Sequence, residues 1–159
     1  MTRETMIAAL KQHPFLQHFG PVYIELLAGL AREVRFEKDE IIFQEGFVSQ
    51  EFCLVTGGMI AIEIVNPGHT FRVQTLNGGD EFGWSALLDG HGTLFQSRAL
   101  EASTAIAFDT HRLKAACVSN TDFGFALMQR MLGVVSERLQ ATRLQLLDMC
   151  SPAAHRGGM

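Results

Sequence analysis

The sequence is poor in cysteine and in long apolar runs, and each scarcity excludes a class of protein. Its three cysteines, Cys53, Cys117 and Cys150, lie far apart and are odd in number, which suits free thiols in a reducing compartment better than a disulfide framework. No stretch approaches the roughly 20 apolar residues of a membrane-spanning helix. Residues 1–14 also lack the basic start and apolar centre of a signal peptide. We therefore expect a cytoplasmic protein without membrane contact.

Positive charge is scarce as well. Thirteen Lys and Arg oppose 17 Asp and Glu, which gives a net charge of −4 at pH 7, and the bases are scattered along the chain. Because binding to nucleic acid relies on a positive face, this balance argues against direct DNA binding. With 47% hydrophobic and 19% charged residues in 159, the composition is that of one globular domain.

The apolar pattern changes character along the chain. Residues 2–30 have helical spacing interrupted at Pro14 and Pro21, which indicates two short helices, with Pro21 in the first turn of the second. From 33 to 109, short runs of period two alternate with turns rich in glycine, asparagine and aspartate, which indicates about eight short strands. Since no helices separate the strands, we expect antiparallel pairing in a rolled double sheet.

The helical period returns after Asp109, with a short helix expected at 111–117 and a long one from Thr121 to Met149, about 43 Å in length. Apolar residues of the long helix alternate spacings of three and four, as in the seam of a coiled coil: Phe125, Met128, Leu132, Val135, Leu139, Thr142, Leu146 and Met149. We expect Phe125 and Met128 to pack on the protein's own roll, and the stripe from Leu132 onward to form a parallel homodimer.

These elements define one domain over residues 1–150. It divides into N-terminal helices at 1–31, a β-roll at 32–110 and C-terminal helices at 111–150, followed by a flexible tail at 151–159.

The order of these elements resembles the cyclic-nucleotide-binding domain of the family of the cyclic-AMP receptor and the fumarate–nitrate regulator. The matching blocks are Phe15-Leu16, Leu26 to Leu30, Lys38 to Gly46, Phe52 to Ile62 and Gly79 to Gly83. The resemblance implies a mainly β fold, an eight-stranded antiparallel jelly roll with N-terminal helices and a long C-terminal dimerisation helix. Asp39 replaces a turn glycine of the family, and aspartate tolerates the left-handed backbone conformation expected there.

The resemblance places the family's phosphate-binding cassette at Phe82, Gly83, Trp84, Ser85, Ala86 and Leu87. In the family, backbone N–H groups receive a cyclic phosphate, a glutamate holds the ribose, and an Arg-Ser/Thr-Ala triplet follows. Here Trp84 replaces the glutamate, and Thr93, Leu94 and Phe95 occupy the place of the triplet. Loss of the arginine contact would weaken binding by on the order of tenfold to several hundredfold. Ordinary cyclic-nucleotide binding is therefore disfavoured.

Further candidate ligand contacts follow the cassette. Thr93 and Ser97 lie in the next segment, whereas Arg98 is expected on the opposite, solvated face of a strand that buries Ser97 and Ala99. Trp84 either packs at the mouth of the pocket, which we favour, or shapes a smaller apolar cavity.

The long helix adds two candidate contacts. Thr142 matches the family's threonine that reaches the nucleotide base across the dimer, and Arg143 follows where the family often has serine. Thr142 as a polar seam residue that fixes the register of the coiled coil is an equally open interpretation.

The sequence gives little sign of an iron–sulfur cluster, a metal site, a catalytic nucleophile or a DNA-binding domain. Iron–sulfur relatives carry closely spaced N-terminal cysteines, which are missing before Cys53. Four histidines have no metal-ligand spacing and are expected to be surface or capping residues: His13, His18, His69 and His91. Ser85 lacks a nucleophile elbow. A winged helix would need about 60 further residues, and few follow the long helix. We expect no cofactor and no direct DNA binding.

The sequence thus predicts a non-catalytic regulatory module, homodimeric through its last helix, that senses a small molecule and acts on an unidentified effector protein. One alternative is genuine binding of cyclic AMP or cyclic GMP through backbone N–H groups and Thr142. A second is a ligand-free interaction scaffold in which Trp84 and Phe95 fill the pocket. A cupin-like enzyme is the catalytic alternative and would need a bound metal.

Overall fold

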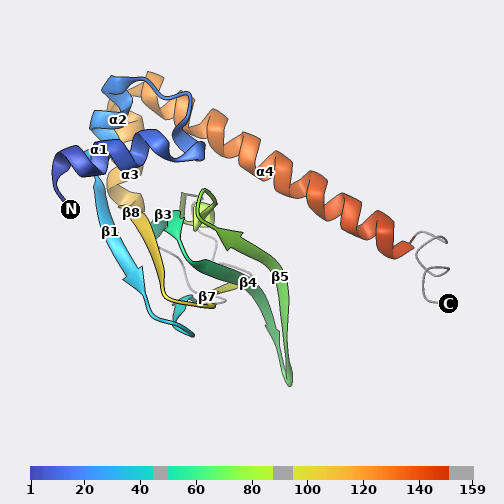
Figure 1. Cartoon of the computed structure of the whole chain (residues 1–159). Helices are drawn as coiled ribbons and strands as arrows, with labels where there is room; N and C mark the ends of the chain where they lie inside the picture. The colour runs from blue at the N-terminus through green and yellow to red at the C-terminus, as the bar shows by residue number, and fades with distance from the viewer. Residues whose placement is uncertain (45–49, 88–94, 151–159) are drawn as a thin grey trace.

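The computed structural model describes residues 1–44, 50–87 and 95–150, which contain eight strands in two four-stranded sheets (Figure 1). One sheet has the order β1-β8-β3-β6 and the other β2-β7-β4-β5, with antiparallel pairing throughout. The strands are β1 (Ala31–Phe36), β2 (Ile41–Phe43), β3 (Glu51–Gly57), β4 (Met59–Asn66), β5 (His69–Asn77), β6 (Glu81–Phe82), β7 (Gln96–Ala99) and β8 (Ser103–Asp109). The predicted eight-stranded antiparallel roll is confirmed.

Helices precede and follow the roll, as predicted. Those before it are α1 (Arg3–Gln12), the short 3-10 helix η1 (Pro14–Leu16) and α2 (Pro21–Ala28), and those after it are α3 (Thr110–Ser119) and α4 (Thr121–Cys150). A further 3-10 helix, η2 (Trp84–Leu87), lies within the roll between β6 and β7. Pro21 occupies the first turn of α2, where a missing N–H costs nothing. The Asn120 side chain accepts the Phe123 N–H at 3.1 Å and so caps α4. The predicted tail at 151–159 lies outside the described residues.

Strand β3 is buried on both faces, which explains its continuous apolar run. Phe52 and Leu54 face the helices and join the larger core, whereas Cys53 and Val55 face the second sheet and join the smaller one. The same alternation holds in β8, where Ile106 contacts the helix side. The β1-β8-β3-β6 sheet is therefore the middle layer, covered by helices on one face and by the β2-β7-β4-β5 sheet on the other.

Asp39 adopts the left-handed backbone predicted for it. Its φ of 70° is the single positive value at a non-glycine position among the described residues. The Asp39 N–H donates to the Ala99 carbonyl at 2.7 Å, which fixes the turn between β1 and β2 against β7. The substitution of the family's glycine thus preserves the turn.

Helix α4 has an anchored half (121–138) and a free half (139–150). In the anchored half Phe123, Leu127, Met131 and Val134 are buried against the core under the helices. Every residue of the free half is exposed, and the helix projects away from the roll (Figure 1). At 1.5 Å per residue the free half extends about 18 Å.

The expectation that Phe125 and Met128 pack on the roll is wrong. Their exposed fractions are 70% and 44%, so they lie on the outer side of the anchored half. The helix carries two apolar stripes with similar spacing, and the one through Phe123 and Leu127 is buried. The predicted seam therefore runs along the solvent face of α4 from its first turns onward.

Candidate functional site

The cassette begins with a turn that only glycine can make. Gly83 has a φ of +83°, and a Cβ atom there would come within 2.5 Å of the Glu51 carbonyl oxygen and 2.9 Å of the Phe43 ring. The Ala86 N–H donates to the Gly83 carbonyl at 3.0 Å and closes the first turn of η2. The backbone of the predicted cassette therefore turns directly after β6.

The rest of the cassette packs toward the helices. Trp84 and Leu87 are half-buried against the core that also contains the anchored half of α4, and Ala86 is buried. Ser85 is half-buried. Helix η2 contacts both β3 and α3. Trp84 thus makes packing contacts with the core, the role favoured from the sequence.

The segment after the cassette contributes Ser97, which is bound to its own sheet. Its Oγ accepts the Phe43 N–H at 3.2 Å, at the point where the register between β2 and β7 shifts, and the residue is buried. The hydroxyl therefore joins two strands. Thr93 lies outside the described residues, and Phe95 is 41% exposed, which does not match a side chain that fills a closed pocket.

Arg98 lies on the face opposite to Ser97 and Ala99, as expected, and its side chain is 32% exposed, but it is held in an ion pair. Its Nε and Nη2 atoms donate to the two carboxylate oxygens of Glu63, at 3.1 and 2.7 Å, and Gln96 Nε2 donates to Glu63 at 3.0 Å. Burial would raise the pKa of Glu63, but these hydrogen bonds outweigh it and lower the pKa. Arg98 is engaged in a bidentate ion pair on the outer face of the sheet.

A second ion pair joins α4 to the start of the cassette. Arg138 Nη2 donates to Glu81 Oε1 at 2.7 Å and also to the main-chain carbonyl of Glu81, the residue directly before Phe82. Burial raises the pKa of the Glu81 carboxyl, and nearby Arg138 opposes that shift. The sequence analysis did not identify this contact, because Glu81 and Arg138 lie 57 residues apart and no local pattern connects them.

Thr142 and Arg143 are exposed on the free half of α4. The Thr142 hydroxyl donates to the Arg138 carbonyl one turn earlier, at 2.9 Å. Neither interpretation of Thr142 is tested in a single chain, because each requires a second protomer.

The predicted dimer stripe is largely uncovered. Of its six residues, Val135 is half-buried and Thr142 is exposed. The remaining four side chains have exposed fractions of 48 to 73%: Leu132, Leu139, Leu146 and Met149. Dimerisation stays a prediction.

His13 is a capping histidine, as predicted. Its Nδ1 accepts the Phe15 N–H at 3.2 Å, so Nε2 carries the proton and donates to the Val55 carbonyl at 3.0 Å. Burial lowers the pKa of His13. In the described part of the chain, no three His, Cys, Asp or Glu side chains lie close enough together to hold a metal ion.

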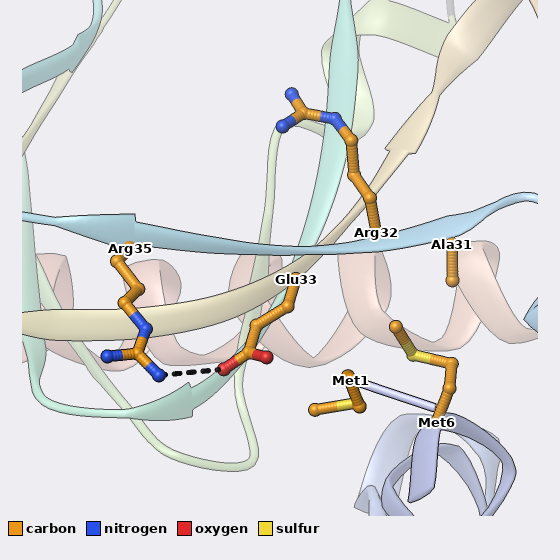
Figure 2. Close-up of a pocket in the computed structure, with 6 residues that line it drawn as sticks. All are labelled: Met1, Met6, Ala31, Arg32, Glu33 and Arg35. Carbon is orange, nitrogen blue, oxygen red and sulfur yellow. Dashed lines mark ion pairs between the residues drawn. The ribbon is translucent and has the colours of Figure 1, made fainter. Parts of the chain in front are cut away.

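A hollow elsewhere on the surface lies between the start of α1 and the outer face of β1 (Figure 2). It has a volume of about 430 Å³ and is lined by Met1, Met6, Ala31, Arg32, Glu33 and Arg35. Its charged side chains already pair: Arg35 with Glu33 at 3.7 Å, and Arg32 with Glu51. None of its lining residues belongs to the cassette, so this hollow does not serve the candidate site.

The family follows from a comparison of the sequence with family profiles. The profile described as "Cyclic nucleotide-binding domain" matches residues 33–120, more than half of the chain. The protein therefore belongs to the cyclic nucleotide-binding domain family, as the sequence blocks indicated. A comparison with curated proteins found no match. No helix in the described ranges is long and apolar enough to cross a membrane.

Solved structures share the fold at low identity. A cyclic nucleotide-binding domain from Methylobacillus flagellatus has a TM-score of 0.79 at 13% identity, over 94% of this chain and 84% of that one. The sensor domain of the transcriptional regulator DNR from Pseudomonas aeruginosa has 0.69 at 18%, over 87% and 93%. The regulatory subunit of a cAMP-independent protein kinase A from Trypanosoma brucei has 0.66 at 20%, over 80% of this chain but only 47% of that one.

Proposed function

We propose that the protein is a non-catalytic regulatory module that senses a small molecule at the cassette and passes the state of the cassette through α4 to an effector protein. The observation that carries this proposal is the Arg138–Glu81 contact, which connects the helix directly to the strand that opens the cassette. Since an allosteric module needs a physical link between two sites, this contact supplies the first requirement of the function.

The proposal includes a weak site for ordinary cyclic nucleotides. Trp84 stands where the family's glutamate is expected, and its half-buried ring packs against the helix-side core. Arg98, the nearest arginine after the cassette, is held by Glu63 on the outer face of the sheet. Trp84 therefore supplies no acid for the ribose, and Arg98 supplies no arginine for the phosphate.

Homodimerisation through α4 is part of the same proposal. Leu132, Leu139 and Leu146 are exposed along one face of the helix. A free half of about 18 Å with an apolar stripe is a liability for a monomer, whereas a parallel pair of helices would bury it.

The proposal also includes a protein effector and a cytoplasmic location. The effector is a second protein, because a sensor module passes on its state by changing its contacts with a partner. A reducing compartment, the cytoplasm, is supported by the three thiols, all of which are unpaired.

The test is isothermal titration of the whole protein with cyclic AMP and cyclic GMP. We expect no binding tighter than micromolar for either nucleotide. A submicromolar dissociation constant would overturn the degenerate-site proposal and establish the alternative of genuine cyclic-nucleotide binding. That alternative is favoured by the family match and by the preserved Gly83 turn.

A further inference from the structure

The 3-10 helix η1 is joined to the roll through a buried histidine. His13, which is 4% exposed, lies directly before η1 and donates from Nε2 to the Val55 carbonyl of β3 at 3.0 Å. The same carbonyl accepts the Gly79 N–H at 2.9 Å. A Cβ atom at Gly79 would lie only 3.3 Å from the Pro14 ring, so the turn at 77–80 packs directly on η1. The histidine therefore ties η1 to β3 at the point where this turn is also attached.

The next aromatic residue of η1 fills the core under the helices. Phe15 is 1% exposed, and the centre of its ring lies 5.4 Å from that of Phe52. Arg130 of α4 donates to the Phe15 carbonyl at 2.8 Å, and its guanidinium lies 5.2 Å from the centre of the Phe15 ring. The N–H of Phe15 is accepted by His13 Nδ1 at 3.2 Å. The placement of Phe15 thus depends on the same histidine.

The two hydrogen bonds of the His13 ring require a neutral imidazole in one tautomer, because Nδ1 accepts while Nε2 donates. A proton taken up from solvent binds at Nδ1 and converts this acceptor into a donor that faces the Phe15 N–H. Since both ring nitrogens then carry hydrogen, the ring has no acceptor left for that N–H. A buried N–H that loses its acceptor destabilises the closed arrangement of η1.

The surroundings of the ring determine when this happens. Burial is the largest influence and lowers the pKa of His13 below the usual 6.5. The main-chain groups of Val55 and Asp80 and the Asp80 carboxylate, in the turn at 77–80, act in the opposite direction, whereas Arg130 of α4 adds to the lowering. The ring is therefore neutral at pH 7, and the closed arrangement loses stability as the pH falls below 6.5.

We propose that His13 is an acid-sensitive latch: the neutral ring holds η1 against β3 and the turn at 77–80, and protonation of the ring releases η1 while the remaining fold stays closed. This inference goes beyond the proposed sensing function and does not rest on it. The signal is acidity rather than a small molecule, and the part that moves is η1, which carries the buried Phe15.

The test is amide hydrogen exchange of the whole protein, followed by NMR. We expect the protection of the Phe15 N–H, corrected for the intrinsic effect of pH on exchange, to fall by up to tenfold for each pH unit below about 6.5. Low concentrations of urea should leave this exchange unchanged, because a local opening exposes little surface. The buried Leu127 N–H in α4 is the comparison, since its exchange should report global unfolding and accelerate with urea.

Two variants separate the latch from other effects of pH. His13→Asn keeps a side-chain acceptor at the start of η1 but has no titrating ring, so the protection of the Phe15 N–H should no longer depend on pH in this range. His18→Gln removes an exposed histidine and, as the matched control, should retain the full dependence.

The parent protein alone provides a second decision. Proton–nitrogen spectra of the ring should show the Nε2–H tautomer at pH 7, and the loss of Phe15 protection should level off at the pH where the ring itself titrates. The proposal is overturned if the ring carries its proton on Nδ1, or if the protection of Phe15 does not change with pH. It is equally overturned if exchange at Phe15 follows urea as steeply as at Leu127, or if His13→Asn retains the pH response.

Discussion

At the scale of single residues, two substitutions account for the proposed loss of nucleotide affinity. In the proposed alignment with the family, Trp84 stands at the position of the acid and Thr93 at that of the arginine. We predict that Trp84→Glu combined with Thr93→Arg raises the affinity for cyclic AMP by more than the roughly tenfold to several hundredfold of the arginine contact alone, because each side chain adds a charge-assisted hydrogen bond. Calorimetric titration measures the gain. Trp84→Leu, which removes the ring without adding charge, is the control, and a double variant that binds no better than this control would contradict the prediction.

His13 makes the stability of the protein depend on pH. Burial lowers its pKa in the folded chain below the usual 6.5, so between these two values the unfolded chain binds a proton that the folded chain does not. Stability therefore falls as the pH drops below about 6.5. We predict a decrease of the urea midpoint over this range that is reduced in His13→Gln. The exposed His18 provides the control, since His18→Gln should retain the full decrease; an equal effect of both variants would refute the assignment.

At the scale of elements, α4 is held by buried apolar residues in its anchored half and, at the end of that half, by a nearly buried ion pair. The Glu81 and Arg138 side chains are 9% and 22% exposed. We predict that Arg138→Met destabilises the fold by about 2–4 kcal/mol, because the Glu81 carboxylate loses its partner. Glu81→Leu with Arg138→Met should recover most of this loss. Urea unfolding of the four members of the cycle measures the coupling energy, and additive effects would show that the two residues do not interact.

The sequence predicted elements wherever local chemistry determines them. Pro21 at a helix start and Asp39 in a left-handed turn follow from backbone geometry alone. The buried face of α4 was assigned wrongly at Phe125, because two stripes of similar spacing run along one helix and only tertiary packing selects between them. The Glu81–Arg138 contact spans 57 residues and has no local pattern, so it could not be inferred without coordinates.

At the scale of the whole molecule, the free half of α4 is the surface that a second copy would cover. Leu139 and Leu146 lie on the predicted seam, whereas Leu144, 61% exposed, lies on another side of the helix. We predict that Leu139→Glu or Leu146→Glu converts a dimer to monomers at micromolar concentration, because a charge in the seam must be desolvated. Sedimentation equilibrium measures the change, and Leu144→Glu is the matched control.

The direction of the two helices can be tested in the same protein. In a parallel pair, Met149 meets its own copy, so Met149→Cys should form an intermolecular disulfide on mild oxidation. This experiment needs Cys150→Ser as background, because Cys150 is exposed beside it. Crosslinking lost on introduction of Leu146→Glu would tie the disulfide to the seam. If instead Leu144→Glu dissociates the dimer and Leu146→Glu does not, the assembly uses another face of α4 than the predicted seam.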